Sequence, residues 1–440
     1  MAEIQTIAPV RHGWQGEVEI PGDKSISHRS VMFAGLGNTR VHIRNFLHAA
    51  DCLSTVGVMR ALGVDVEFLN ENELIVTGKG LHGLSEPMTV LDAGNSGTTL
   101  RLMMGLLAPQ PFLSTFCGDA SLTRRPMARV LLPLSQMGAK IYGRNVNKNL
   151  PLTIVPTAEK LRGIRYESPV ASAQVKSAIL LAGLYADAPT TVTEPYVSRD
   201  HTEQMLAGFG VHLERTGTSV TVFPVEEGSY RAPDEITVPG DISSAAYFLV
   251  AGTIIEGSRL LLKNVGINPT RTGILDVLTE MGADIRLQNE RTSGGERVAD
   301  IIVASASLRG ISFGAEIMPR LIDEIPVIAV AALFAEGDTV ITGAGELRVK
   351  ETDRLHAIAE EFQKLAPGSV EEQEDGLIIH GKTEIRQAQV SSWGDHRMAM
   401  SLAVLGAAAE GVRIEEPDSV NISYPRFFSE MECLSKGGSL

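Results

Sequence analysis

The sequence predicts an α/β protein of two domains, built from six repeats of the order βαβαββ. Three observations support this fold class. The chain has 440 residues, which is more than one hydrophobic core normally holds. An amphipathic helix followed by glycine and a strand recurs at a nearly constant interval, and a second, very apolar helix occurs once in each interval.

The first helix class ends at a glycine that an alternating strand follows. It appears as "VMRALGVDVEF", "LSQMGAKIYG", "MLAGFGVHLER" and "LTEMGADIRL", with glycines at Gly63, Gly138, Gly210 and Gly282, spaced 75, 72 and 72 residues apart. Glycine often ends a helix in the left-handed conformation. Two weaker copies, "AEEFQKLAPGSVEE" and "MECLSKGGSL", bring the repeats to six, and we expect the last repeat to stop at its helix.

The second helix class is small, very apolar and opened by Ser, Gly or Asp. Its members are "SISHRSVMFAGLG", "NSGTTLRLMMGLL", "SAQVKSAILLAGLY", "ISSAAYFLVAGTI", "DEIPVIAVAALFAEG" and "DHRMAMSLAVLGAAAEG". A helix that is apolar on nearly all sides must be buried. We therefore expect these helices to run through the middle of their domains, covered by α/β sheets.

Two copies of "PGD", at Pro21 and Pro239, divide the repeats into two groups of three. This predicts one domain of residues 22–239 and a discontinuous one of residues 1–21 with 240–440, with hinge crossings near 21–22 and 239–240. The alternative is that both copies are ordinary strand-to-helix turns with Asp as N-cap. Only the first copy precedes basic residues, in "PGDKSISHR", so we expect chemistry at that copy alone.

Composition and charge exclude several classes of protein. The formal net charge of -14 argues against binding to nucleic acid or to anionic membranes. Three distant cysteines without CxxC spacing indicate a reducing compartment and no structural zinc. A secretory or transit pattern and an apolar run of the ~20 residues that span a membrane are both missing, so we expect a cytoplasmic protein. Motifs of P-loop kinases, zinc hydrolases and serine hydrolases are also missing.

The loops that open three of the buried helices carry residues suited to anions. "DKSISHR" holds Lys24 and Arg29, "GNSGTTLR" holds Gly97, and "SAQVKS" holds Ser172 and Gln174. Free amide groups and the positive end of the helix dipole make a helix N-terminus an anion site. One such loop is weak evidence, because Gly-rich turns are common, but three in corresponding repeats favour a binding role.

A second set of loops supplies arginines and carboxylates. Arg125, Arg199, Arg354 and Arg397 lie in "SLTRRPMARV", "VSRDHTEQ", "RVKETDRL" and "GDHRMAM". Arginine binds phosphate and carboxylate through paired hydrogen bonds, so several arginines in one cleft predict a ligand with both groups. The alternative for "RVKETDR" is a solvated helix face with local ion pairs. Asp323 and Glu324, in "LIDEIPVIAV", are either N-caps or partly buried acid–base groups.

With these motifs, the chain resembles the enolpyruvyl transferases over essentially its whole length. The resemblance rests on "PGDKSISHR", "GNSGTTLR", "TRRPM", "SAQVKSA", "DEIPVIAVAA", "RVKETDR" and "DHRMAM", in that order. It implies two domains, each an inside-out α/β barrel of three βαβαββ units with central helices, which close over substrate. It also implies transfer of the enolpyruvyl group from phosphoenolpyruvate to the 5-hydroxyl of shikimate 3-phosphate through a tetrahedral intermediate, with no metal or organic cofactor.

The resemblance also implies a role for each matching residue. Lys24 is expected to touch both substrates, Asp323 to take the proton from the attacking hydroxyl, and Glu351 to protonate the methylene carbon. Shikimate 3-phosphate is expected to contact Lys24, Ser25, Arg29, Ser172, Ala173, Gln174, Arg199, Asp323 and Lys350. Phosphoenolpyruvate is expected to contact Lys24, Gly97, Thr98, Arg125, Gln174, Glu351, Arg354, His396 and Arg397. We expect a monomer, since the sequence shows no apolar edge or heptad.

Two departures concern the inhibitor glyphosate, which the resemblance implies as a competitor of phosphoenolpyruvate. Many relatives have a lysine where this chain has Ile422, in "NISYPRFF". Tolerant members carry Ala at the position of Gly97, so we expect glyphosate to inhibit this protein and Gly97→Ala to weaken that inhibition.

Two rival functions remain open at the level of the sequence. The sister enzyme acting on UDP-N-acetylglucosamine usually has a loop cysteine where this chain has Ala120, and Cys117 is expected at a strand end. An anion-binding protein without chemistry would keep the arginines but would not need Asp323 and Glu351 together.

Overall fold

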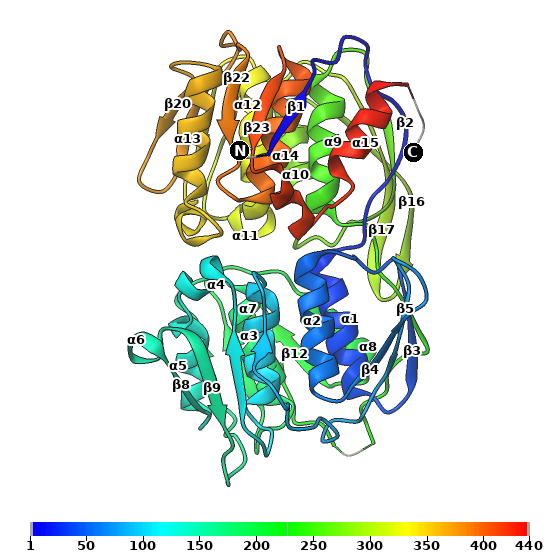
Figure 1. The fold of residues 1–440 in the computed structure, drawn as a ribbon, viewed down its shortest axis with the longest axis vertical. Coiled ribbons are helices and arrows are strands. Elements are labelled where there is room, and N and C mark those ends of the chain that lie inside the picture. Colours follow the sequence, from blue (N-terminus) through cyan, green and yellow to red (C-terminus); the bar gives the residue numbers. More distant parts are fainter. Residues whose placement is uncertain (1–2, 227, 438–440) are drawn as a thin grey trace. The chain divides into compact units, whose positions relative to one another are not determined.

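The structure is a computed structural model that describes residues 3–226 and 228–437. The chain forms two compact units. Unit 1 comprises Met1–Pro21, Pro239–Thr292 and Glu296–Leu440, and unit 2 comprises Gly22–Val238 with Ser293–Gly295. In Figure 1, unit 2 is coloured from blue through cyan to green. Most of unit 1, which follows residue 238, is coloured from green through yellow to red.

Each unit contains three sheets. The sheets of unit 2 have the strand orders β14-β3-β5-β4, β6-β7-β9-β8 and β10-β11-β13-β12. Their strands are β3 (Arg40–Arg44), β4 (Asp65–Phe68), β5 (Leu74–Thr77), β6 (Leu91–Asp92), β7 (Ser114–Cys117), β8 (Lys140–Gly143), β9 (Asn149–Val155), β10 (Arg165–Glu167), β11 (Thr190–Thr193), β12 (Leu213–Thr216), β13 (Ser219–Val222) and β14 (Glu235–Thr237). Cys117 thus ends strand β7, as predicted.

The sheets of unit 1 have the orders β16-β17-β15-β2, β18-β19-β21-β20 and β1-β23-β22. Their strands are β1 (Ile4–Ile7), β2 (Gln15–Glu19), β15 (Arg259–Gly266), β16 (Asp284–Ser293), β17 (Glu296–Ala304), β18 (Ser312–Phe313), β19 (Asp338–Ile341), β20 (Val370–Glu372), β21 (Leu377–His380), β22 (Ala388–Ser391) and β23 (Val412–Glu415). None of the sheets formed by the described residues closes on itself, so the implied barrel is not a closed β-barrel.

Distant strands complete the first repeat of each unit. Strand β14 pairs in parallel with β3, which places Ile236 opposite Ile43 although the residues are far apart in the chain. Strand β2 pairs in parallel with β15, with Val18 opposite Leu262. In the last repeat β1 pairs with β23, where the other repeats use their own final strand. The predicted βαβαββ order is therefore confirmed, with strands that precede each change of unit filling the incomplete repeats.

The predicted apolar helices lie in the two cores. They are α1 (Lys24–Leu36), α3 (Gly97–Leu107) and α7 (Ala173–Gly183) in unit 2, and α9 (Ile242–Ile254), α12 (Ile325–Phe334) and α14 (His396–Ala408) in unit 1. All buried apolar residues of α9, α12 and α14 belong to the core of unit 1. Helices α3 and α7 approach so closely that a Cβ on Gly105 would lie 2.1 Å from the carbonyl oxygen of Ala178.

The amphipathic helices also follow the prediction. They are α2 (Ala50–Ala61), α5 (Ala128–Gln136), α8 (His201–Gly208), α10 (Gly273–Met281), α13 (Arg354–Leu365) and α15 (Phe427–Ser435). Gly63, Gly138, Gly210 and Gly282 all have positive φ angles after these helices, a conformation that glycine adopts without strain. The short helices are α4 (Ala120–Arg124), α6 (Arg144–Asn147), α11 (Met318–Leu321), η1 (Ile322–Glu324), η2 (Gly345–Val349) and η3 (Pro417–Ile422).

Both "PGD" turns cap a helix at the point where the chain changes unit. The Asp23 carboxylate accepts the amide of Ile26, and the Asp241 carboxylate accepts the amide of Ser243. The Asp241 amide donates to the carbonyl of Pro21 at 2.9 Å, so the two turns are neighbours. The N-cap alternative and the change of unit are therefore both true of these turns.

Within residues 3–226 and 228–437, no helix has the length and apolarity that a membrane crossing requires.

Candidate functional site

The N-termini of α3 and α7 meet through a bond between two predicted residues. The side chain of Ser96 caps α3, and that of Ser172 caps α7. Gln174 Nε2 donates to Thr98 Oγ1 at 3.0 Å. Arg101 Nη1 donates to Gln174 Oε1 at 2.6 Å and adds a cation that the sequence analysis did not assign. Two positive helix ends and a guanidinium thus gather at one place, which suits an anion.

Arg125 brings a second cation to the start of α3. It ends helix α4, is 8% exposed and donates from Nη2 to Asn95 Oδ1 at 2.6 Å. A Cβ on Gly97 would lie 2.7 Å from Arg101 Nη1 and 3.4 Å from Arg125 Nη1. Only a glycine leaves this space open without moving a guanidinium, so Gly97 lies directly beside Arg101 and Arg125. Their contact with phosphoenolpyruvate stays a prediction.

Lys24 and Arg29 lie on the first turns of α1 but have different surroundings. Lys24 Nζ forms an ion pair with Asp51 Oδ2 at 3.2 Å and stays partly exposed. Arg29 is 4% exposed and donates from Nε to Thr202 Oγ1 at 2.7 Å and from Nη2 to Ser177 Oγ at 2.9 Å. Its Nη1 donates to the carbonyl of Ser25. Arg29 therefore links α1, α7 and α8 inside unit 2, and its contact with substrate stays a prediction.

Ser172, Ala173 and Arg199 occupy the ends of α7 and α8. Ala173 is the first residue of α7, and the Ser172 amide donates to Glu194 Oε1 at 2.7 Å. Arg199 lies in the segment between β11 and α8, half-buried, two residues before the helix begins. These residues form the second anion-suited group of unit 2.

In unit 1, Asp323 is the centre of a cluster of three cations. Arg354 Nη1 lies 3.3 Å from Asp323 Oδ1, and Lys350 Nζ lies 3.6 Å from the same oxygen. Arg397 Nη2 lies 3.8 Å from Asp323 Oδ2, and its Nη1 donates to the Asp323 carbonyl at 3.2 Å. Opposite charges this close favour the ionised carboxylate, which is the form a proton acceptor needs.

Glu351 belongs to the same cluster through Arg354. Arg354 Nη2 donates to Glu351 Oε2 at 2.7 Å, and its Nε donates to Asp395 Oδ2 at 2.7 Å. Burial alone would lower the pKa of Arg354, but Asp395 and Glu351 outweigh burial and raise it. The pKa of Arg397 is raised in the same way, against burial, chiefly by Asp323. Both guanidiniums therefore remain fully charged.

Glu324 and His396 complete this part of unit 1. Glu324 is 1% exposed and bonds to Ser243 Oγ, which also accepts Arg271 Nη2 at 2.8 Å. Among the described contacts, neither Asp323 nor Glu324 caps its helix with its side chain, and the acid–base role of Asp323 stays a prediction. His396 begins α14, is 1% exposed and lies next to Asp395. Arg271 and Asp241 form an ion pair at 3.0 Å at the second "PGD" turn. The expectation that only the first copy takes part in chemistry stays a prediction.

Three residues that the sequence did not single out as site residues each contact a predicted one: Asp51 contacts Lys24, Arg101 contacts Gln174 and Asp395 contacts Arg354. Arg101 lies four residues after Gly97 on α3, a spacing that puts both on one face of the helix, and this signal could have identified it. Asp51 comes from another helix and gave no comparable signal. Among the described residues, no group of three or more His, Cys, Asp and Glu could hold a metal ion.

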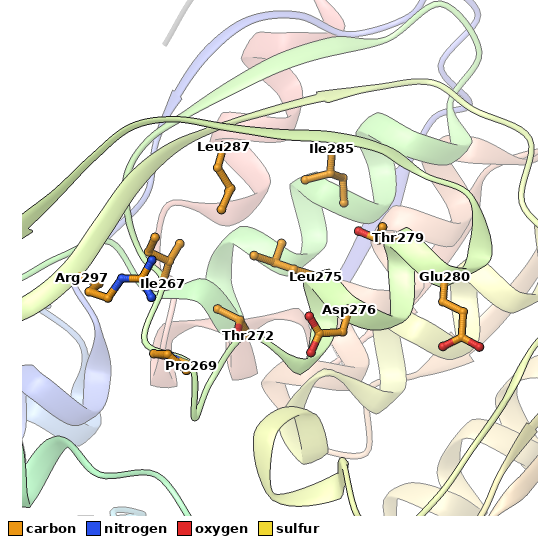
Figure 2. Close-up of a pocket in the computed structure, with 10 residues that line it drawn as sticks. All are labelled: Ile267, Pro269, Thr272, Leu275, Asp276, Thr279, Glu280, Ile285, Leu287 and Arg297. Atoms are coloured by element: carbon orange, nitrogen blue, oxygen red, sulfur yellow. The ribbon is translucent and has the colours of Figure 1, made fainter.

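A cavity of about 620 Å³ lies elsewhere in unit 1, between α10 and the hairpin of β16 and β17. Figure 2 shows Leu275, Ile285 and Leu287 around it, with Asp276 and Glu280 on one side. None of the predicted site residues lines it. Its apolar walls and carboxylates do not suit two anionic substrates, so we do not place the site there.

Three comparisons report which known proteins this chain resembles. The pattern of the family "EPSP synthase (3-phosphoshikimate 1-carboxyvinyltransferase)" matches residues 10–431. Proteins named 3-phosphoshikimate 1-carboxyvinyltransferase from Bacillus cereus and Bacillus anthracis are 52% identical over 433 residues, which is 98% of this chain and 99% of theirs. The solved EPSP synthase of Acinetobacter baumannii has a TM-score of 0.86 and 41% identity, covering 100% of this chain and 99% of its own.

A more distant structure shows the fold alone. The enolpyruvyl transferase NikO from Streptomyces tendae has a TM-score of 0.78 at 17% identity, covering 99% of this chain and 98% of its own.

Proposed function

Because this chain belongs to the EPSP synthase family, we propose that it transfers the enolpyruvyl group of phosphoenolpyruvate to the 5-hydroxyl of shikimate 3-phosphate and releases phosphate. The observation that carries the proposal is the cluster of unit 1, where Asp323 and Glu351 share Arg354. Two carboxylates on one guanidinium supply the proton acceptor and the proton donor that addition and elimination need.

In the addition step, the 5-hydroxyl oxygen bonds to C2 of phosphoenolpyruvate. Asp323 takes the hydroxyl proton, and Glu351 gives a proton to C3, which becomes a methyl group. In the elimination step the C2–O bond to phosphate breaks and phosphate leaves with the proton that Asp323 holds, while C3 returns a proton to the Glu351 carboxylate and the double bond is restored. The cations Lys350, Arg354 and Arg397 keep Asp323 ionised before the first step.

Glu351 can donate a proton only after its contact with Arg354 is broken, because that contact at 2.7 Å favours the charged carboxylate. We propose that the carboxylate of phosphoenolpyruvate takes Arg354 as its own partner. Glu351 then loses its counter-ion in a place without bulk water and gains affinity for a proton.

We assign the remaining groups to substrate binding. Shikimate 3-phosphate contacts Ser25, Arg29, Ser172, Ala173, Gln174, Arg199 and Lys350, and phosphoenolpyruvate contacts Gly97, Thr98, Arg125, Gln174, Arg354, His396 and Arg397, with Lys24 touching both. Anion-suited helix ends and buried arginines support these assignments. We propose a monomer that works in the cytoplasm.

The test mixes the protein with phosphoenolpyruvate and either shikimate 3-phosphate or UDP-N-acetylglucosamine, and measures phosphate release. We expect release with the first acceptor only. Asp323→Ala and Glu351→Gln should each reduce the rate by about 10²–10⁴-fold. Phosphate release with the second acceptor alone would make this chain the sister enzyme, and binding of both anions without release would favour the non-catalytic alternative.

A further inference from the structure

Unit 2 contains a buried ion cluster that the reaction does not use directly. Lys176 on α7 has its Nζ 2.9 Å from Glu203 Oε1 and 3.1 Å from Glu194 Oε2. The side chains are 1–2% exposed. Lys176 Nζ also donates to the carbonyl of Ser198 at 3.2 Å. Burial lowers the pKa of Lys176, but Glu203 and Glu194 outweigh it and raise the pKa, so the amine stays charged.

Burying such an ion cluster in a protein core is energetically unfavourable. Transfer of charges from water to the protein interior is unfavourable, and apolar residues of similar size often stabilise a protein as well or better. The cluster also carries two negative charges against one positive charge, and Glu203 Oε2 has no hydrogen-bond partner among the residues that the structure describes. Stability therefore gives a poor reason for its presence, and its contacts suggest another.

Glu194 connects two segments whose residues Ser172 and Arg199 we assign to shikimate 3-phosphate. Its Oε1 accepts the Ser172 amide at 2.7 Å, at the N-terminus of α7. Its Oε2 accepts Ser198 Oγ at 2.7 Å, and Ser198 directly precedes Arg199 in the chain. One buried carboxylate thus holds both the helix end and the loop that carries the arginine.

We propose that Glu194 is a positioning residue for shikimate 3-phosphate, which rests on the proposed function. Lys176 holds the Glu194 carboxylate in place through their ion pair, so that one oxygen faces the Ser172 amide and the other faces Ser198 Oγ. Ser172 and Arg199 are then fixed relative to each other before the ligand arrives. Binding groups held in advance lose less entropy on binding and stay close to the productive geometry. Glu203 also forms an ion pair with Lys176, but the described contacts include no bond from Glu203 to Ser172 or to Ser198.

The test compares Glu194→Gln with Glu203→Gln, which remove the same charge from the same buried lysine. An amide has one acceptor oxygen and one donor nitrogen. In Glu194→Gln, an amide oxygen that accepts from Ser172 leaves the NH2 group facing two other donors, Lys176 Nζ and the Ser198 amide. On that side only a bond to the Ser198 hydroxyl oxygen can then form, so the link to the Ser198 segment is weakened. In Glu203→Gln the oxygen can face Lys176, while the nitrogen replaces an oxygen that has no partner within the described part of the chain.

We expect calorimetry to show the dissociation constant of shikimate 3-phosphate rising about tenfold in Glu194→Gln. It should change less than about twofold in Glu203→Gln, and the KM for phosphoenolpyruvate should stay near that of the unmodified protein in both variants. Equal effects of the two variants, or an unchanged constant in Glu194→Gln, would overturn the proposal. If Glu194→Gln does not fold, Ser198→Ala removes one of the two links and should still weaken binding about threefold.

Amide exchange of the ligand-free protein provides a readout that does not depend on the reaction. Segments around Ser172 or Ser198 should exchange faster in Glu194→Gln than in Glu203→Gln, because one link is weakened. Failure of the unmodified protein to bind shikimate 3-phosphate would refute the proposed function while leaving this comparison intact. Equal exchange in the two variants would refute the positioning role alone.

Discussion

At the scale of the residue, the absence of a single side-chain atom determines how close the charged groups of the site can lie. Gly97 begins α3 beside the guanidiniums of Arg101 and Arg125, and an added methyl group would lie 2.7 Å from Arg101 Nη1. The far end of a flexible side chain can move, but Arg101 would then leave Gln174. The space beside Gly97 is thus narrow on the side where we expect phosphoenolpyruvate to bind.

We expect Gly97→Ala to weaken inhibition by glyphosate, in competition with phosphoenolpyruvate, by about tenfold or more, because the methyl group takes space from the inhibitor. Inhibition constants from steady-state kinetics measure this effect. Arg101→Lys is the control, since it keeps the charge and loses the bond to Gln174 without adding bulk. An unchanged inhibition constant in Gly97→Ala would remove the steric argument.

Residue-level reasoning predicted the types of the site residues better than their partners. Lys24 and Asp323 were predicted from segments that open buried helices, and Arg354 from the charged segment that opens the amphipathic helix α13. Their partners come from distant segments: Arg354 Nη1 reaches Asp323 across 31 positions of the sequence, and Arg397 reaches it across 74. Spacing along a chain carries no information on such contacts.

At the scale of the element, the helices were predictable and the strand partners were not. A helix that is apolar all round and a glycine after an amphipathic helix are local signals, and the structure confirms both. The pairing of β14 with β3 joins segments from opposite ends of unit 2, and that of β2 with β15 joins segments of unit 1 between which the chain runs through all of unit 2's main segment. No local signal specifies which strand completes a sheet.

The close contact of α3 and α7 leads to a prediction on stability. Gly105→Ala would place a methyl group 2.1 Å from the carbonyl oxygen of Ala178, so we expect it to lower the free energy of unfolding by ~1–3 kcal/mol. Gly57→Ala on α2 is the matched control, since nothing lies within 4 Å of its new Cβ. Gly57→Ala should raise the free energy of unfolding by ~0.5–1 kcal/mol, because alanine favours a helix more than glycine does. Urea titrations measure both, and equal shifts would contradict the packing argument.

At the scale of the whole molecule, each unit supplies one part of the chemistry. Unit 2 offers helix ends and cations, and unit 1 offers the carboxylates with their own arginines. We propose that both sets are needed to bind the two substrates and to move both protons, and that the substrates draw the two units together.

Small-angle scattering with and without saturating shikimate 3-phosphate tests this claim most directly. We predict that the radius of gyration falls when the ligand is added, and falls further with glyphosate present. A radius that stays constant under conditions where the protein releases phosphate from both substrates would contradict the account.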